Sequence, residues 1–129
     1  MKIIRSQEVA FIPASHEDRD NPGVLKKILF NKNDFIAGSV QMINWALLPR
    51  GSSFASHYHE DMQEIFIMLN GPVIITADGT RKTLWSGDSI SIPPRCVHTM
   101  QNRAHEDVAY IVVGISMGTG GKTVVTHND

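Results

Sequence analysis

The middle of this chain is built from short runs of β-branched and aromatic residues separated by turn-forming residues. Many short runs at close spacing, without a long stretch of helical periodicity, favour an antiparallel β-sandwich or barrel. Between two of the runs, Asp78 and Gly79 are typical of a two-residue hairpin, because both central positions of that turn favour positive φ. The segments predicted as strands are 40–48, 54–59, 64–69, 73–77, 81–85, 89–92, 96–101 and 109–116.

The two ends of the chain are patterned differently. Residues 1–14 are apolar enough for one strand, and residues 15–23 are polar and rich in turn formers, which indicates a loop. Residues 25–29 fit a short helix or a strand equally well. We expect a single domain over residues 1–129, with an N-terminal arm and loop (1–37), a core (about 38–115) and a Gly-rich tail (117–129).

Composition excludes several classes of protein. Hydrophobic residues make up 42% and charged residues 19% of the 129 positions, which is the balance of an ordinary globular domain. Twelve Lys and Arg against thirteen Asp and Glu leave a net charge of −1, so we expect no nucleic-acid partner. No apolar run is long enough to span a membrane, and one cysteine cannot form an intramolecular disulfide. We therefore expect a cytoplasmic protein with no membrane partner.

Three of the six histidines stand at metal-ligand spacing. His57 and His59 are two apart in a predicted strand, so their side chains leave the same face. Glu64 begins the next run after a segment long enough to turn, and His98 lies on a separate strand. Three imidazoles and one carboxylate suit one divalent transition metal ion (Mn, Fe, Co, Ni, Cu or Zn) with positions left open for water or substrate.

The spacing of these residues resembles the two motifs of the cupin family over about residues 38–115. The first motif, Gly-x5-His-x-His-x4-Glu-x6-Gly, is matched by Gly51, His57, His59, Glu64 and Gly71. The second, Gly-x5-Pro-x-Gly-x2-His-x3-Asn, is matched by Gly87, Pro93, His98 and Asn102, with Arg95 where the family has glycine. The match at nearly every fixed position makes this a strong resemblance.

The resemblance implies an all-β fold, an antiparallel jelly-roll β-barrel (cupin) with a short N-terminal arm and little helix. It implies that the metal lies inside the barrel and that its ligands are His57, His59, Glu64 and His98. Glycines of the motifs would serve turns between strands, where a side chain would clash or φ must be positive. The arginine at position 95 leaves the conformation of its own turn open, and it could place a cation near the barrel mouth.

Strand alternation extends the prediction to a substrate pocket. If Glu64 and His98 point inward, residues two and four positions away on the same strands also do. The pocket candidates are Phe66, Met68, Arg95, Cys96 and Met100. The alternative for these residues is that the apolar ones and the thiol simply fill the core, and that Arg95 is a solvated surface residue.

The opposite face of the segment 64–69 is also apolar, since Ile65, Ile67 and Leu69 occupy it. A strand that is apolar on both faces is covered on both. The cover would be a second sheet edge, the N-terminal arm or a dimer partner. Together with the resemblance, this strand leads us to expect a homodimer.

Two functions follow from a metal site of this kind. The first is a metal-dependent enzyme acting on a small molecule, either an isomerase, epimerase or lyase, or a dioxygenase. For the isomerase, epimerase or lyase, the resemblance to the family implies sugar phosphates or uronates as substrates, and Arg95 would suit their anionic ends. The alternative is a non-catalytic cupin that binds or senses a metal or small ligand. No residue beyond the four ligands stands out as an acid or base.

One further motif and the other histidines are set aside. Residues 116–123 differ by one position from a phosphate-binding loop, but the short polar and β-branched remainder offers no helix to follow it, and we expect a flexible tail. His16 and His127 have no partner at ligand spacing, so we expect them to be exposed, and we expect His105 to take no part in the site either.

Overall fold

The computed structural model describes residues 1–118 and 122–126, and it confirms the all-β fold. Within these residues the helices are two 3-10 turns, η1 (Ser6–Glu8) and η2 (Lys32–Asp34). The strands are β1 (Lys2–Ile4), β2 (Ile12–Pro13), β3 (Leu25–Lys26), β4 (Ser39–Leu48), β5 (His57–His59), β6 (Met62–Met68), β7 (Val73–Ala77), β8 (Thr80–Leu84), β9 (Ser89–Ile92), β10 (His98–Gln101), β11 (Val108–Ser116) and β12 (Thr123–Val125).

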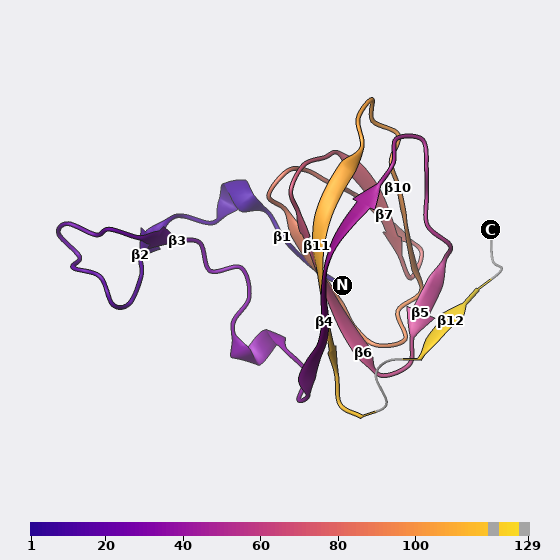
Figure 1. The fold of residues 1–129 in the computed structure, drawn as a ribbon, viewed down its shortest axis with the longest axis horizontal. Helices are drawn as coiled ribbons and strands as arrows, with labels where there is room; N and C mark the ends of the chain where they lie inside the picture. The colour runs from indigo at the N-terminus through magenta and orange to yellow at the C-terminus, as the bar shows by residue number, and fades with distance from the viewer. Residues whose placement is uncertain (119–121, 127–129) are drawn as a thin grey trace.

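Two five-stranded antiparallel sheets make the body of the molecule. One has the order β1-β9-β6-β11-β4 and the other β12-β5-β10-β7-β8. They curve around a common interior, while the small β2–β3 hairpin extends away from the body (Figure 1). The buried cluster between the sheets comprises Leu48, Phe66, Met68, Val73, Ile75, Ala77, Leu84, Ile90, Ile92, Cys96, Met100, Val108, Tyr110 and Val112.

The predicted strands agree with the observed ones over most of the core. The segments 73–77 and 89–92 coincide with β7 and β9. The hairpin between β7 and β8 also has the expected turn, since φ is +47° at Asp78 and +81° at Gly79. The strand expected over 96–101 begins only at His98, because a turn with Arg95 at positive φ precedes it and engages the N–H of Cys96, which donates to the carbonyl of Pro93.

The ends of the chain differ more from expectation. The single strand expected within residues 1–14 is replaced by β1 and β2 on either side of η1. Within 25–29 only the two-residue β3 forms. The prediction of a flexible tail was wrong for residues 123–125, which form β12 by pairing with β5. His127 and parts of the Gly-rich tail (119–121 and 127–129) lie outside the described residues.

The outer face of β6 is covered in part by the N-terminal arm. Ile65 is buried and Ile67 partly so, and both line a groove of about 590 Å³ together with residues 26–31, Phe35 and Val113. A second sheet edge, the N-terminal arm or a dimer partner was expected to cover this strand, which is apolar on both faces. Within one copy of the chain, the N-terminal arm covers it. Nowhere in residues 1–118 and 122–126 is there a helix of the length and apolarity that crossing a bilayer requires.

Candidate metal centre

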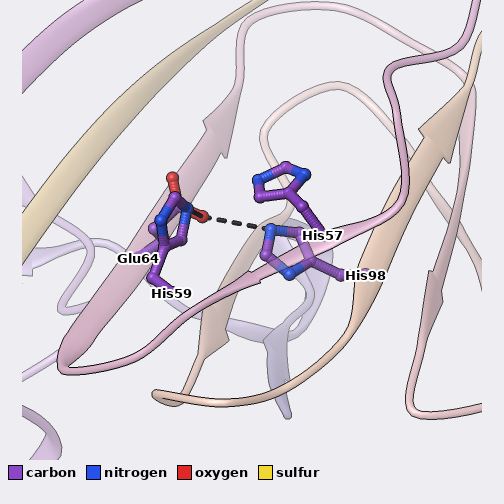
Figure 2. A group of neighbouring side chains, drawn as sticks. All are labelled: His57, His59, Glu64 and His98. Atoms are coloured by element: carbon purple, nitrogen blue, oxygen red, sulfur yellow. Dashed lines mark hydrogen bonds and ion pairs between the residues drawn. The ribbon is translucent and has the colours of Figure 1, made fainter. Parts of the chain in front are cut away.

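Three strands bring four polar side chains together inside the barrel. His57 and His59 lie on β5, and His98 on β10 stands directly opposite His57 in the antiparallel register. Glu64 reaches them from β6 in the other sheet (Figure 2). One ligand atom from each residue lies within 4.8 Å of all the others. The structure thus assembles the set of residues that the sequence spacing predicted.

The cluster is buried on one side and more open on the other. Glu64 and His98 are buried and His59 is 9% exposed, whereas His57 is only half-buried. Burial lowers the pKa of His57, and this outweighs the effect of its hydrogen bond to the carbonyl of Ala55. His57 therefore favours the neutral form, which is the form that binds a metal.

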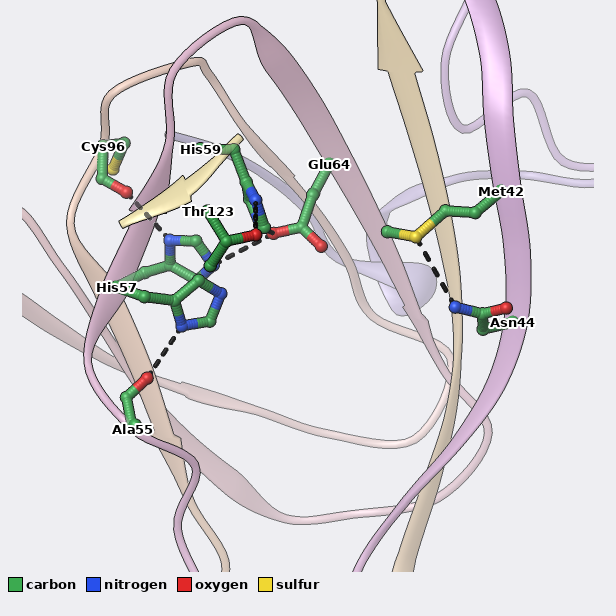
Figure 3. A network of polar contacts seen from close by, with 9 residues as sticks. Met42, Asn44, Ala55, His57, His59, Glu64, Cys96 and Thr123 are labelled. Carbon is green, nitrogen blue, oxygen red and sulfur yellow. Dashed lines mark hydrogen bonds and ion pairs between the residues drawn. The ribbon is translucent and has the colours of Figure 1, made fainter. Parts of the chain in front are cut away.

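Each imidazole has Nδ1 within hydrogen-bonding distance of an oxygen atom outside the cluster, and Figure 3 labels His57 and His59 with these partners. Nδ1 of His57 lies 2.7 Å from the carbonyl of Ala55, and Nδ1 of His98 lies 2.8 Å from the carbonyl of Cys96. Nδ1 of His59 lies 3.0 Å from the hydroxyl of Thr123 on β12. Outer partners of this kind fix the ring orientation of metal-binding histidines and leave Nε2 for the ion.

Glu64 faces two of these imidazoles. Its Oε1 lies 2.8 Å from Nε2 of His59 and 3.1 Å from Nε2 of His98. Burial opposes ionisation of Glu64, but the hydrogen bonds and charges of the two histidines outweigh it and lower its pKa to about 2. The carboxylate is therefore ionised inside the barrel at neutral pH.

The donor chemistry fits a bound cation. A carbonyl oxygen only accepts, so Nδ1 of His98 carries its hydrogen toward Cys96, and neutral Nε2 presents a lone pair. That lone pair faces Oε1 of Glu64, an acceptor as well. Either a proton on the imidazole or a metal ion must resolve this contact. Nitrogen and carboxylate oxygen donors together suit a divalent transition metal.

Aromatic rings surround the histidines. The ring centroid of Phe54 lies 5.4 Å from that of His57 and 6.0 Å from that of His98. Phe66 lies 6.2 Å from His98 on the other side. These rings exclude water from the side of the cluster they cover, which strengthens electrostatic interactions there.

The predicted pocket residues divide into two groups. Phe66, Met68 and Met100 are buried in the core cluster, as strand alternation requires, and Cys96 is buried there from the turn before β10. Core filling and pocket lining are both compatible with these positions. Arg95 is exposed. Burial, with a contribution from Asp78, raises the pKa of the Cys96 thiol to about 11, so it is uncharged at neutral pH.

Arg95 adopts the backbone conformation that the family assigns to glycine. Its φ is +65°, and its N–H donates to the carbonyl of His59 at 2.7 Å. The turn is therefore retained without glycine, and it ties the loop before β10 to β5. Gly51 and Gly87 also have positive φ, as expected for turn glycines. Gly71 does not, but a Cβ there would lie 3.0 Å from the carbonyl oxygen of Leu84, so its role is close approach.

Asn102, the last residue of the second motif, has a structural role. Its Nδ2 donates to the carbonyls of Leu48 and Glu106, and its Oδ1 accepts from the N–H of Ala104. This buried amide closes the loop after β10. None of these three hydrogen-bond partners belongs to the histidine cluster.

Tyr110 is a residue that sequence reasoning missed. It lies on β11 opposite Met68, is 7% exposed, and its ring centroid is 5.1 Å from that of Phe66. Burial and the charge of Glu64 raise its pKa to about 12, so the phenol keeps its proton. Strand alternation could not identify it, because apolar residues occupy both faces of the segment 109–116 and no pattern shows which face is buried.

Two antiparallel sheets form a small barrel, and three histidines and a carboxylate lie together in its interior. The fold and the site together define the class of small β-barrel proteins with a candidate metal site. Residues 44–114 match the Cupin domain family (Cupin_2), and the chain belongs to this family. This confirms the resemblance seen in the two motifs and the jelly-roll type of barrel that it implied.

Similar proteins span several activities. An uncharacterized protein of Methanocaldococcus jannaschii is 30% identical over 102 residues, which cover 79% of this chain and 78% of that protein. Quercetin 2,3-dioxygenase of Bacillus subtilis is 34% identical over 67 residues, 50% of this chain but 20% of the enzyme. A sugar phosphate isomerase of the cupin superfamily from Silicibacter pomeroyi has a similar fold, with a TM-score of 0.58, 23% identity, and coverage of 67% and 57%.

Proposed function

We propose that this protein is a metal-dependent enzyme that acts on a small molecule bound inside the barrel. The observation that carries the proposal is the arrangement of His57, His59, Glu64 and His98, with one ligand atom from each within 4.8 Å of the others. Their Nδ1 hydrogen bonds and the ionised carboxylate prepare the set for a cation.

A metal held by these four residues would supply Lewis acidity or a redox centre at its open positions. The half-buried His57 marks the side from which a ligand can reach the cluster. Phe54 and Phe66 limit water on the remaining sides. Tyr110 keeps its proton, packs against Phe66 and is within reach of the charge of Glu64; its O–H would donate to an oxygen of a bound ligand.

The reaction is proposed in two versions. A sugar phosphate isomerase shares the fold, and the exposed Arg95 could contact an anionic end of such a substrate. A dioxygenase shares 34% identity over half of this chain, and the apolar surroundings of the cluster suit that chemistry. In both versions Tyr110 is the group available to hold or move a proton.

A non-catalytic metal-binding role is the second candidate. The same outer hydrogen bonds that prepare the ligands would serve a protein that stores a metal or senses a small ligand. Such a protein would complete the coordination of the metal with its own groups and would turn over no substrate.

The decisive experiment is elemental analysis of protein purified without added metal, followed by metal soaking. We expect about one ion per chain in the wild type, loss of that ion in His57→Ala, and retention in His105→Ala, which changes an exposed histidine. A wild type that retains no stoichiometric metal even after soaking overturns the proposal.

The identity of the bound ion and one further variant separate the candidates. Iron or copper favours the dioxygenase version, while zinc or nickel favours an isomerase, a lyase or a binding role. Tyr110→Phe should keep the metal and lose turnover or ligand affinity. A metal-loaded wild type without turnover on sugar phosphates, uronates or chelating aromatic substrates supports the non-catalytic role.

A further inference from the structure

A hollow lies on the outer face of the sheet that carries the three histidines. Val73 and Ile75 of β7 belong to the core, so Ile74 between them faces outward, paired with Thr83 of β8. The hollow has a volume of about 260 Å³. Its lining includes Pro72, Ile74, Thr83, Trp85, Arg103 and Ala104. It is therefore separate from the barrel interior, where the candidate metal ligands lie.

Arg103 gives this hollow a positive charge. Its side chain is exposed, and no described residue forms an ion pair or a hydrogen bond with its guanidinium. The other described residues that line the hollow are uncharged. A neighbouring hollow of about 390 Å³ shares Pro72, Arg103 and Ala104 but also contains Glu106. An anionic group is thus attracted to Arg103 and repelled from the surface beyond it, which fixes the end of the hollow where it binds.

Trp85 gives the same hollow a flat apolar wall. Its side chain is 57% exposed and lines the hollow together with Arg103. Pro72, Ile74 and Ala104 add further apolar surface. An indole ring favours contact with another aromatic ring, which is worth more than the buried area alone. Apolar walls with one cation therefore favour a molecule that has an aromatic ring and a negative charge.

The backbone that carries these two residues is held in place. The N–H of Trp85 donates to Oδ2 of Asp88 at 2.9 Å, and the N–H of Asp88 donates to the carbonyl of Trp85 at 3.0 Å. On the other side, Oδ1 of the buried Asn102 accepts from the N–H of Ala104 at 2.9 Å, so Arg103 lies within a closed turn. A site on fixed backbone loses less entropy when a ligand binds.

The size of the hollow restricts the ligand further. Drug-sized ligands occupy pockets of about 300–1,000 Å³, and a cavity of about 150 Å³ holds benzene. A volume of about 260 Å³ therefore suits a single ring with a small substituent. A carboxylate is small, and it pairs with an arginine fork through two parallel hydrogen bonds.

We propose that this hollow binds a small aromatic carboxylate, whose ring packs on Trp85 and whose carboxylate pairs with Arg103. The proposal rests on an exposed indole and a guanidinium without a partner among the described residues, both lining one hollow. It is independent of the proposed metal-dependent function, because the hollow lies outside the barrel.

Titration of isotope-labelled protein with benzoate, followed by NMR, tests the site. Saturable shifts are expected in the indole N–H of Trp85 and in the backbone N–H groups of residues 73–74, 83–85 and 103–104. A ligand of this size should bind with a dissociation constant of about 1 mM. The same shifts should appear in His57→Ala, which excludes a carboxylate bound to metal. Shifts confined to β5 and β10, or no saturation at about ten times that concentration, overturn the proposal.

Two variants and two analogues test the charge and the ring separately. Arg103→Gln should weaken benzoate binding about tenfold, because a hydrogen bond to a charged group is lost. Trp85→Leu should weaken it about threefold or more, because the contact between the rings is lost. Arg19→Gln changes an exposed arginine of the N-terminal arm and is the control.

The analogues should both bind more weakly than benzoate. Benzamide keeps the ring without the charge, and cyclohexanecarboxylate keeps the charge without the aromatic ring. All three changed positions are exposed, so the remaining NMR signals should match the wild type and show that the variants fold. Unchanged affinity in Arg103→Gln, or binding of either analogue as tight as that of benzoate, contradicts the proposal.

Discussion

At the scale of single residues, the three histidines of the cluster share one arrangement. Each has Nδ1 bonded to an oxygen outside the cluster, which leaves Nε2 for the centre. In the metal-free protein, the contact between Glu64 and His98 requires a proton. Binding of a metal at this site is therefore expected to release protons.

The ionisation of Glu64 predicts how the metal-free protein responds to acid. Folding lowers its pKa from the ordinary value of 4.5 to about 2. The carboxylate therefore stabilises the fold above pH 4.5, and this contribution is lost as pH falls toward 2. Chelator-treated wild type should lose up to about 3 kcal/mol of unfolding free energy over this range that Glu64→Gln does not lose.

Urea denaturation at a series of pH values measures this difference. Glu8→Gln, which changes an exposed carboxyl of the arm, is the control and should follow the wild type. Parallel acid dependence in the wild type and Glu64→Gln would show that the histidines do not hold the carboxylate in the folded state.

The positive φ at Arg95 predicts that replacing this residue by glycine does not destabilise the fold and can stabilise it. A non-glycine residue at φ +65° is strained by about 1 kcal/mol or more, and glycine relieves this while losing some entropy on folding. Arg95→Gly should therefore be as stable as the wild type or more stable by up to about 1 kcal/mol in chemical denaturation. Arg81→Gly, within β8, should instead be destabilised, and a similar loss in Arg95→Gly contradicts the prediction.

At the scale of elements, β12 supports β5, the strand that carries His57 and His59. Its residues Thr123 and Val125 stand opposite His59 and His57 in the register. The pairing covers an edge of β5, which is otherwise bonded to β10 through one residue pair. The position of two proposed ligands therefore depends on a strand near the end of the described chain.

Removal of the Thr123 hydroxyl should weaken metal binding. Thr123→Val removes the hydroxyl that lies 3.0 Å from Nδ1 of His59, and loss of such an outer partner costs about 10- to 100-fold in metal affinity. Competition titration with a chromophoric chelator measures this change. Thr126→Val is the control because Thr126 bonds to Ser56 and not to the cluster. Equal affinity in Thr123→Val and the wild type would exclude this role.

Local pattern predicted the strands whose runs and turns are self-contained, such as β7 and β9. It failed for β12, because three β-branched or hydroxyl residues form a strand only when a distant segment pairs with them. The motif spacing identified His57, His59, Glu64 and His98 as candidate ligands. It could not reveal Thr123 or Tyr110, whose nearness to that cluster depends on the pairing of strands far apart in the sequence.

At the scale of the whole molecule, the proposed ligands join the two sheets. Glu64 belongs to the sheet that ends at β4, and the three histidines belong to the sheet that contains β12. A metal held between them would connect the two layers directly. Its binding free energy would then contribute to the stability of the complete barrel.

Metal removal should therefore lower the melting temperature. At a metal concentration one hundred times the dissociation constant, binding stabilises the fold by about 2.7 kcal/mol. For a chain of this size that corresponds to about 10 °C in Tm. Differential scanning calorimetry of chelated and reloaded protein measures the shift, which should vanish in His57→Ala and persist in His105→Ala. A shift of equal size in His57→Ala would place the stabilising ion elsewhere.

The place of β12 has a consequence for the order of events on the ribosome. The groups that surround the cluster extend from Ala55 to Thr123, so the chain up to Thr123 must leave the exit tunnel before they can all meet. A nascent chain can form the hairpin of β7 and β8 early, but His59 acquires its supporting hydroxyl only after 64 further residues have been made. Full affinity for metal is thus reserved for chains whose synthesis has passed Thr123, and stalled or shortened products would compete poorly for the ion.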